Sequence, residues 1–263
     1  MKITLITSNQ KRHKYFTNLL SKISSELFVI EEKKNIVDDR LPKTNYGFSE
    51  IRKKYYEKVT AAENDLFGKN LILDKNIKKI LSIDFGKLNQ HSLDELNPYL
   101  KSDIYIVFGT SYIKSELIDF LIQNKALNIH MGISPYYRGT DCNFWALYDE
   151  NPHLVGATIH YISKGVDTGP MLYHAVSSNY NIDPWGYSMS SVKSAFISLV
   201  ERIKNQTIFS YKPIFQDKTN EIRYSKKIDF NDQVIQDFFD KKIDLQSKKF
   251  NLNLLKEPFI LNS

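Results

Sequence analysis

The short apolar run from Ala126 to His130 constrains most strongly what this chain can fold into. It ends in Asn128-Ile129-His130, and a short apolar run of this kind is typical of a buried β-strand. Side chains alternate between the two faces of a strand, so Asn128 and His130 project in the same direction. Open α/β sheets bind their ligands beyond the carboxyl ends of the strands. We therefore expect the amide and the imidazole to meet in a ligand crevice.

A carboxylate lies in the turn-rich run from Gly165 to Pro170, after a predicted strand at residues 155–162. We expect this residue, Asp167, to reach back to the imidazole of His130. An isolated Asn-x-His is more often a strand end whose histidine is satisfied by its neighbours. The ordered occurrence of amide, imidazole and carboxylate over about forty residues favours a catalytic site instead.

These three residues belong to a longer pattern. In chain order it comprises Asn128-x-His130, Pro135-x-x-Arg138-Gly139, Trp145, Gly156-x-Thr158-x-His160 and Asp167-Thr168-Gly169. The pattern resembles the formyltransferases that use 10-formyltetrahydrofolate, which include glycinamide ribonucleotide, methionyl-tRNA and sugar-nucleotide enzymes. The resemblance covers about residues 1–204 and is strongest over residues 108–172. It implies that Asn128, His130 and Asp167 are the catalytic residues.

The chemistry of formyl transfer explains why these three residue types are needed. The reaction requires a neutral amine, a tetrahedral oxyanion intermediate and a proton for the departing nitrogen. His130 is expected to move the proton, since an ordinary imidazole titrates near neutral pH. Asn128 is expected to donate to the oxyanion, where one donor contributes about 3 kcal/mol. Asp167 would orient the imidazole, and no covalent acyl-enzyme is required.

Cys142 is the only cysteine of the chain. A single cysteine excludes an intrachain disulfide framework and suits a reducing cytoplasm. Cys142 has no evident base partner in the sequence, so we interpret it as a small packed residue rather than a nucleophile. In the resembled family many members have Pro at this position, and Gly132 and Ser134 stand where most have Ser and Leu.

The turn after a predicted strand at residues 103–108 is the candidate cosubstrate loop. In the resembled family the corresponding loop lines the pterin pocket and binds the ring largely through backbone groups. A glycine also allows a flat ring to approach the backbone closely, although taken alone Gly109 would be only a turn residue. The resemblance therefore implies that 10-formyltetrahydrofolate is bound by Gly109, Thr110, Ser111, Tyr112 and Ile113.

Two arginines are candidate contacts for phosphate groups of an acceptor. Arg12 follows the first predicted strand, at residues 3–7, and Arg138 lies in the loop after the catalytic strand. A guanidinium can bind a phosphate through two parallel hydrogen bonds. The alternatives are that Arg12 is a solvated residue of the first helical turn and that Arg138 fixes its own loop. Neither a G-x-G-x-x-G motif nor a P-loop follows the first strand.

The alternation of apolar strands and amphipathic helices predicts an α/β fold with a Rossmann-like, mostly parallel sheet flanked by helices. Helix starts are indicated by a Ser-x-x-Glu capping box at Ser92 and by Asp183-Pro184. We predict a further helix over residues 49–67, ended by Gly68. Its basic and aromatic run, residues 52–56, is interpreted as a solvated helix face rather than a nucleic-acid contact. Residues 31–46 are expected to form a charged loop.

The length of 263 residues, 42% of them hydrophobic, suffices for one full catalytic domain. We assign residues 1–205 to this domain and residues 206–263 to a small C-terminal extension. No apolar run approaches the roughly 20 residues that cross a membrane, so we expect a cytoplasmic protein without a signal peptide or anchor. The histidines show no metal-ligand spacing, and His160 is interpreted as a structural residue on a strand face. A homodimer is an open possibility.

The charge distribution helps to choose the acceptor. The net charge of +6 divides into +4 over residues 1–205 and +2 over residues 206–263. A tRNA-binding enzyme would concentrate its basic excess on one element, so we do not expect a nucleic-acid partner. The glycine-rich phosphate loop usual in the purine-pathway members is also absent. By elimination, the resemblance implies an amino sugar linked to a nucleotide diphosphate, as in bacterial surface-polysaccharide synthesis.

Other functions stay open at this point. Within the resembled family they are methionyl-tRNA or glycinamide ribonucleotide formylation and hydrolysis of the cosubstrate by a deformylase. A non-catalytic folate-fold binding protein is the alternative from another class, but it has no physical need for all three of Asn128, His130 and Asp167.

Overall fold

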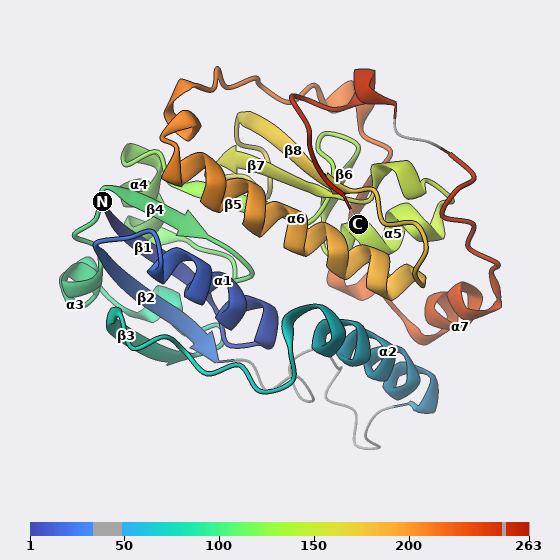
Figure 1. The fold of residues 1–263 in the computed structure, drawn as a ribbon, viewed down its shortest axis with the longest axis horizontal. Helices are drawn as coiled ribbons and strands as arrows, with labels where there is room; N and C mark the ends of the chain where they lie inside the picture. Colours follow the sequence, from blue (N-terminus) through green and yellow to red (C-terminus); the bar gives the residue numbers. More distant parts are fainter. Residues whose placement is uncertain (34–48, 249–250, 263) are drawn as a thin grey trace.

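The computed structural model describes residues 1–33, 49–248 and 251–262. The charged loop expected at residues 31–46 lies outside the described residues from position 34 onward, and the expectation is wrong for residues 31–33, which belong to a strand. In the described part, a central sheet has the strand order β10-β8-β7-β5-β4-β1-β2-β3 (Figure 1). Helices cover both of its faces. This arrangement confirms the expected mostly parallel α/β fold.

The strands of the central sheet are β1 (Lys2–Ser8), β2 (Glu26–Lys33), β3 (Ile77–Asp84), β4 (Ile104–Val107), β5 (Leu127–His130), β7 (Ala157–Tyr161), β8 (Met171–Ser177) and β10 (Phe259–Leu261). A separate pair consists of β6 (Tyr137–Gly139) and β9 (Arg223–Ser225).

The α-helices are α1 (Lys11–Ser21), α2 (Glu50–Phe67), α3 (Leu93–Leu96), α4 (Ser115–Gln123), α5 (Cys142–Tyr148), α6 (Pro184–Lys204) and α7 (Asp232–Asp240). Short 3-10 turns connect them: η1 (Leu88–Gln90), η2 (Asn97–Tyr99), η3 (Pro152–Leu154), η4 (Thr207–Ser210), η5 (Lys218–Asn220), η6 (Lys227–Asp229) and η7 (Leu252–Leu254).

The predicted helix boundaries follow from their caps. The side chain of Ser49 accepts a hydrogen bond from the backbone of Arg52 at the start of α2, and Gly68 ends that helix with φ +90°. Ser92 forms the expected capping box with Glu95. Asp183 caps α6 and is followed by a proline in its first turn. Each cap satisfies backbone N–H groups that have no partner within the helix.

Burial on both faces explains the apolar strands of the sheet. Along β4, Ile104 and Ile106 pack into the cluster shared with α1 and α6, whereas Tyr105 and Val107 pack into the cluster shared with α4. Residues two apart therefore lie on the same face, and both faces are covered. This burial leaves the ends of the strands as the places where polar side chains can gather.

The strand order reverses beside β1. Strand β1 pairs in parallel with β2 on one side and with β4 on the other. Strand β5 continues the parallel order next to β4, and β7 then pairs antiparallel with β5. Open α/β sheets bind ligands beyond the carboxyl ends of the strands at such a reversal. The loops after β1, β4 and β5 meet there.

The C-terminal segment pairs with strands of the preceding part of the chain. Strand β10 pairs in parallel with β8 at the edge of the central sheet, and β9 pairs in parallel with β6, which follows β5 along the chain. Helix α7 packs against α2, where Arg52 forms an ion pair with Asp232 at 2.7 Å and Tyr55 is buried. The prediction that residues 52–56 form a solvated face is therefore wrong for Arg52 and Tyr55, because α7 covers them.

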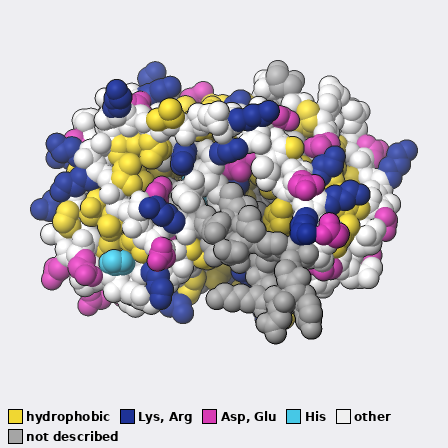
Figure 2. Space-filling view, turned by 90° about the horizontal axis from the view of Figure 1, so that it is seen from below, with side chains coloured by type: hydrophobic (Ala, Val, Ile, Leu, Met, Phe, Trp, Pro, Cys, Tyr) yellow, Lys and Arg dark blue, Asp and Glu magenta, His cyan; other side chains and the backbone are white. Residues whose placement is uncertain are grey.

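The described surface carries both signs of charge. Figure 2 shows one face of the molecule, on which Lys and Arg side chains lie interspersed with Asp and Glu. Among the described helices, none has both the length and the apolar character needed to cross a membrane.

Candidate active site

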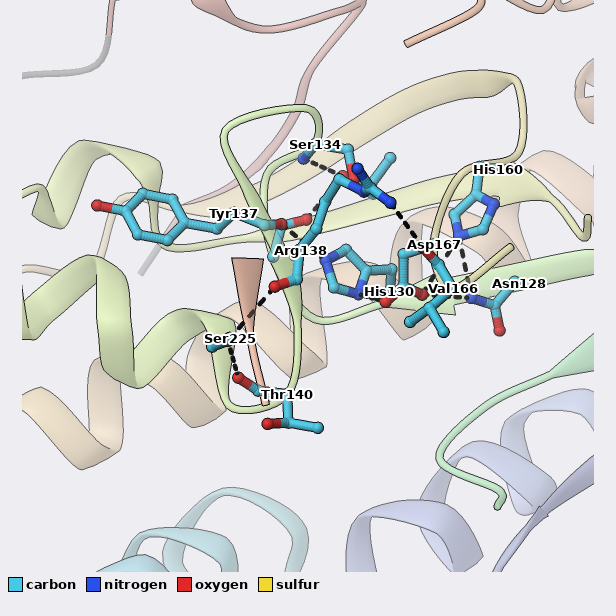
Figure 3. A network of polar contacts seen from close by, with 12 residues as sticks. Asn128, His130, Ser134, Tyr137, Arg138, Thr140, His160, Val166, Asp167 and Ser225 are labelled. Atoms are coloured by element: carbon cyan, nitrogen blue, oxygen red, sulfur yellow. Dashed lines mark hydrogen bonds and ion pairs between the residues drawn. The ribbon is translucent and has the colours of Figure 1, made fainter. Parts of the chain in front are cut away.

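The imidazole of His130 lies at the end of β5, held between two oxygen atoms (Figure 3). Its Nδ1 is 3.2 Å from Oδ2 of Asp167, and its Nε2 is 3.0 Å from the backbone oxygen of Tyr137. The histidine is buried, with 5% of its surface exposed. When Nδ1 donates to the carboxylate, Nε2 is the nitrogen that can exchange a proton.

Asp167 lies in the loop between β7 and β8 and has a left-handed backbone, with φ +50°. Burial alone would raise the pKa of Asp167, but the charge of the neighbouring His130 outweighs it. The pKa is consequently lower than that of an ordinary aspartate. The carboxyl group is ionised at neutral pH and places a negative charge beside the imidazole.

The amide of Asn128 is oriented by His160. Nδ1 of His160 is 2.8 Å from the backbone oxygen of Tyr161, so this nitrogen must carry the proton and donate. Nε2 of His160 then accepts a hydrogen bond from Nδ2 of Asn128 at 3.0 Å. The same amide nitrogen lies 3.5 Å from Oδ1 of Asp167, at the limit of hydrogen bonding. Asn128, His130 and Asp167 are therefore brought together as the sequence predicted.

His160 belongs to this cluster, although we expected it from the sequence to be a structural residue on a strand face. It is buried on β7, and antiparallel pairing places it directly opposite Asn128. Cross-strand neighbours of this kind have side chains in contact. The signal in the sequence was the Gly156-x-Thr158-x-His160 pattern, which shows a polar residue on a strand but not the register that turns it toward the amide.

Two cavities meet at the cluster. The larger, of about 530 Å³, is lined by residues 107–113, 128–131 and 160, and by parts of the loop 162–167 and of the segment 224–226. The smaller, of about 220 Å³, is lined mainly by aromatic and apolar side chains of α2, α5, α6 and α7, together with Arg12. Both include His130, Met131 and Gly139. One molecule in each cavity would therefore approach the same imidazole.

The loop proposed for the cosubstrate lines the larger cavity, with contributions from Gly109, Thr110, Ser111, Tyr112 and Ile113. The sequence suggested that Gly109 lets a flat ring approach the backbone, and the structure shows a second reason for a glycine here. Gly109 has φ +69°, and a Cβ there would lie 2.4 Å from Cε1 of the His13 ring. A contact with another side chain of the protein thus already excludes larger residues at this position.

The two candidate arginines have different surroundings. Arg12 lines the smaller cavity and forms an ion pair with the buried Glu63 at 2.8 Å. Arg138 lines neither cavity: its guanidinium pairs with Glu221 at 2.7 Å and donates to the backbone oxygen of Val166 at 3.0 Å. Of the two roles considered for Arg138, its contacts match fixing a loop rather than binding an acceptor phosphate.

Cys142 is a buried free cysteine at the start of α5. Burial raises the pKa of its thiol well above the ordinary value, and the nearby charge of Asp167 acts in the same direction. The thiol is protonated at neutral pH, and a protonated thiol is a poor nucleophile.

A carboxylate-bound imidazole beside an amide, placed where two cavities meet, fits an enzyme that moves a group between two bound molecules by acid–base catalysis. The family profile described as formyl transferase matches residues 28–198, more than half of the chain. The chain belongs to the formyl transferase family.

Individual relatives agree with this assignment. A methionyl-tRNA formyltransferase from Wigglesworthia glossinidia brevipalpis is 32% identical over 157 residues, 57% of this chain and 46% of the relative. The chain spans less than half the length of the curated relatives it matches.

Solved structures show the same fold. A 4-N formyltransferase from Francisella tularensis matches with a TM-score of 0.53 and 16% identity, over 87% of this chain and 77% of that one. An N-formyltransferase from Helicobacter canadensis, in complex with folinic acid and dTDP-3-aminofucose, matches with a TM-score of 0.53 and 13% identity, over 97% and 86%. The formyltransferase fold expected from the sequence is thereby confirmed.

Proposed function

We propose that this protein transfers a formyl group from 10-formyltetrahydrofolate to the primary amine of a nucleotide-linked amino sugar. The observation that carries the proposal is the position of His130, paired with Asp167 and exposed to both cavities. Formyl transfer requires two molecules to react in one site, and two adjoining cavities with one shared imidazole meet that requirement.

The larger cavity suits the folate cosubstrate. Its volume of about 530 Å³ falls within the usual range for small-molecule sites. The loop at residues 109–113 lines the cavity, and Ile113 and Ile118 supply apolar contacts for a flat ring. The cosubstrate would provide a formyl group on a tertiary nitrogen. The folinic acid in the complex of the Helicobacter canadensis relative supports a folate ligand for this chain.

His130 would act as the proton carrier. It accepts a proton from the acceptor amine as the amine nitrogen bonds to the formyl carbon, and it returns a proton to the departing nitrogen as the old carbon–nitrogen bond breaks. Asp167, 3.2 Å from Nδ1, stabilises the imidazolium that exists between these two transfers. The sum of the steps moves one formyl group and one proton, with no covalent enzyme intermediate.

Asn128 would stabilise the oxyanion of the tetrahedral intermediate. One of its amide hydrogens is directed to His160 at 3.0 Å. The other meets Asp167 only at 3.5 Å, so that hydrogen is the one available to a developing negative charge. A donor of this kind typically contributes about 3 kcal/mol to transition-state binding.

The smaller cavity suits the acceptor. Tyr55, Tyr56 and Trp185 give it apolar faces, on which sugar and base rings can pack. Arg12 at its wall is the candidate contact for a diphosphate. The nucleotide sugar named for the Helicobacter canadensis relative supports this acceptor class.

Methionyl-tRNA is the second candidate acceptor, because the curated relatives are methionyl-tRNA formyltransferases. Against it stands the spread of the basic excess along the chain, +4 over residues 1–205 and +2 over residues 206–263, since tRNA binding requires a concentration of Lys and Arg.

An acceptor screen tests the proposal. Purified protein is incubated with 10-formyltetrahydrofolate and, separately, with amino-sugar nucleotides, glycinamide ribonucleotide or methionyl-tRNA. Tetrahydrofolate release is followed spectrophotometrically and the formamide product by mass spectrometry. We expect formylation of an amino-sugar nucleotide and none of its N-acetylated counterpart, which has no free amine.

The His130→Gln variant is the matched control for this screen, since it keeps the size of the side chain but cannot carry the proton. It should lose turnover by at least about 10²-fold. Acceptor-independent release of tetrahydrofolate would instead indicate a deformylase, and formylation of methionyl-tRNA alone would replace the proposed acceptor.

A further inference from the structure

The loop that carries Asp167 has its backbone oxygens held by side chains from elsewhere in the chain. Asp167 adopts φ +50°, a left-handed backbone conformation that is unfavourable for most non-glycine residues. Such a conformation persists only where surrounding contacts enforce it. The carbonyl groups of Val166, Asp167 and Gly169 each accept a hydrogen bond from a distant side chain.

Gln216 supplies two of these three bonds. Its Nε2 donates to the backbone oxygen of Asp167 at 2.7 Å and to that of Gly169 at 2.9 Å. Since both partners are carbonyl oxygens, the amide must face them with its nitrogen. One side chain thus uses both of its hydrogens on two residues of the loop, which fixes the loop on either side of Thr168.

The segment around Gln216 docks on the protein through this amide rather than through apolar side chains. From residue 212 to residue 220, Gln216 is the one position that is not exposed. Its neighbours Ile214 and Phe215 are 51% and 82% exposed. Two backbone hydrogen bonds between Ile214 and Met171 hold the segment beside the start of β8. An element that served packing alone would bury the phenylalanine instead.

The third bond depends on the same C-terminal segment. Arg138 donates to the oxygen of Val166 at 3.0 Å, and Glu221 pairs with its guanidinium at 2.7 Å. Gln216 therefore holds the loop directly, at the backbone of Asp167 and Gly169. Glu221 acts on the loop indirectly, because it pairs with the arginine that binds Val166. Neither Gln216 nor Glu221 lines either cavity, so neither reaches the proposed substrates.

We propose that Gln216 is a positioning residue for Asp167: its amide holds the loop so that the carboxylate stays 3.2 Å from Nδ1 of His130. The segment after position 205 would then contribute to catalysis through Gln216, and not only to packing. The inference rests on the catalytic role of Asp167 in the proposed function.

Gln216→Met tests the role, because methionine fills a similar volume and donates no hydrogen bond. We expect kcat to fall by about tenfold or more, since a displacement of the order of 1 Å can cost about 10²-fold. The KM values for cosubstrate and acceptor should stay within about twofold, because an interaction made only through the reacting groups leaves ground-state binding intact. Gln236→Met, an exposed glutamine on α7, is the matched control and should leave kcat unchanged.

A direct readout follows the carboxyl group itself. The groups that face Asp167 are the imidazoles of His130 and His160, the thiol of Cys142 and, at the neighbouring carbonyl, the guanidinium of Arg138. If the loop loosens, the carboxylate moves away from His130, whose charge lowers its pKa. Carboxyl-carbon NMR of aspartate-labelled protein should then show the pKa of Asp167 rising toward the ordinary value in Gln216→Met and not in Gln236→Met.

The double variant Gln216→Met/Asp167→Asn separates positioning from general damage. If Gln216 acts through Asp167, the second substitution adds no further loss to Asp167→Asn. Additive losses, or a Gln216→Met enzyme with wild-type kcat and an unmoved Asp167 pKa, would overturn the proposal. If Gln216→Met does not fold, Gln216→Leu, which also donates no hydrogen bond and adds no charge, is measured in its place against the same outcomes. An Asp167→Asn enzyme with wild-type kcat would instead refute the mechanism in the proposed function.

Discussion

Oδ2 of Asp167 lies 3.2 Å from Nδ1 of His130, although the two residues are 37 positions apart on different elements. The imidazole is fixed by β5, and the carboxylate by a loop with its backbone in the left-handed region. An ion pair that is formed in so buried a place depends on its geometry, because both groups lose their hydration. This relationship underlies the first two predictions.

Replacing Asp167 by Asn keeps the shape of the side chain and removes its charge. We expect kcat to fall by about 10² to 10⁴-fold, because the imidazolium that forms during turnover loses its counter-charge. Steady-state kinetics at saturating substrates measure this effect, with circular dichroism as the check on folding. A folded variant with near-native turnover would contradict the role.

The same variant predicts a pH dependence of stability. The folded-state pKa of Asp167 lies below its ordinary value, so the carboxylate stabilises the fold above the unfolded-state pKa of about 3.9. This contribution is lost as the pH falls through the folded-state pKa. We expect the difference in free energy of unfolding between the native protein and Asp167→Asn to shrink as the pH falls below about pH 4. Denaturant titrations at several pH values measure it, and a difference independent of pH would contradict the expected linkage.

The short range of sequence patterns explains what could be predicted and what could not. The strands, the helix caps and the meeting of Asn128, His130 and Asp167 follow from periodicity, local hydrogen bonds and a motif. The position of His160 follows instead from the register between β5 and β7, which periodicity does not encode.

The contacts missed on α2 and around Asp167 have a different origin. Arg52 meets Asp232 across 180 residues, and Gln216 meets Asp167 across 49. These side chains look like ordinary solvated residues until the C-terminal segment is in place. On the charged face of α2 and in the polar loop around Gln216, contacts with residues distant in sequence therefore determine which side chains are buried.

Cys142→Ser tests the absence of a covalent intermediate. The thiol is buried and its pKa is raised, so it is not a nucleophile at neutral pH. We expect kcat within about twofold of the native value, allowing for a polar atom in an apolar place. Mass spectrometry of enzyme quenched during turnover should find no added formyl group. Loss of activity in a folded Cys142→Ser protein, or a formylated enzyme, would contradict direct attack by the amine.

Glu32→Gln tests how the cosubstrate loop is held. The carboxylate of Glu32 is fully buried at the end of β2 and accepts hydrogen bonds from the backbone of Gly86 and from the backbone and hydroxyl of Ser111. An amide puts a donor where an acceptor is needed, so at least one bond is lost, at a cost of about 1.4 kcal/mol or tenfold. We expect the KM for 10-formyltetrahydrofolate to rise about tenfold.

The acceptor provides the internal control for Glu32, because the carboxylate does not line the smaller cavity. The acceptor KM should therefore stay unchanged. Ser111→Ala, which removes the hydroxyl bond alone, should have the same effect in weaker form. Equal rises in both KM values would indicate a general loosening of the site.

The last prediction concerns Arg12 and the diphosphate of the acceptor. Arg12 lines the smaller cavity, but its guanidinium pairs at 2.8 Å with Glu63, whose side chain is 4% exposed. Arg12→Ala alone would leave a buried carboxylate without its partner, a change that typically costs about 3 to 5 kcal/mol of stability. Glu63→Gln is therefore the reference protein, and Arg12→Ala/Glu63→Gln is the test.

We expect the acceptor KM of the double variant to exceed that of the reference by about 10 to 100-fold, since hydrogen bonds to charged groups contribute about 1.5 to 3 kcal/mol. The KM for 10-formyltetrahydrofolate should not differ between the two. The difference should also vanish with an amino sugar that lacks the nucleotide diphosphate, because Arg12 would then have no phosphate to bind. Equal acceptor KM values for the reference and the double variant would remove Arg12 from the acceptor site.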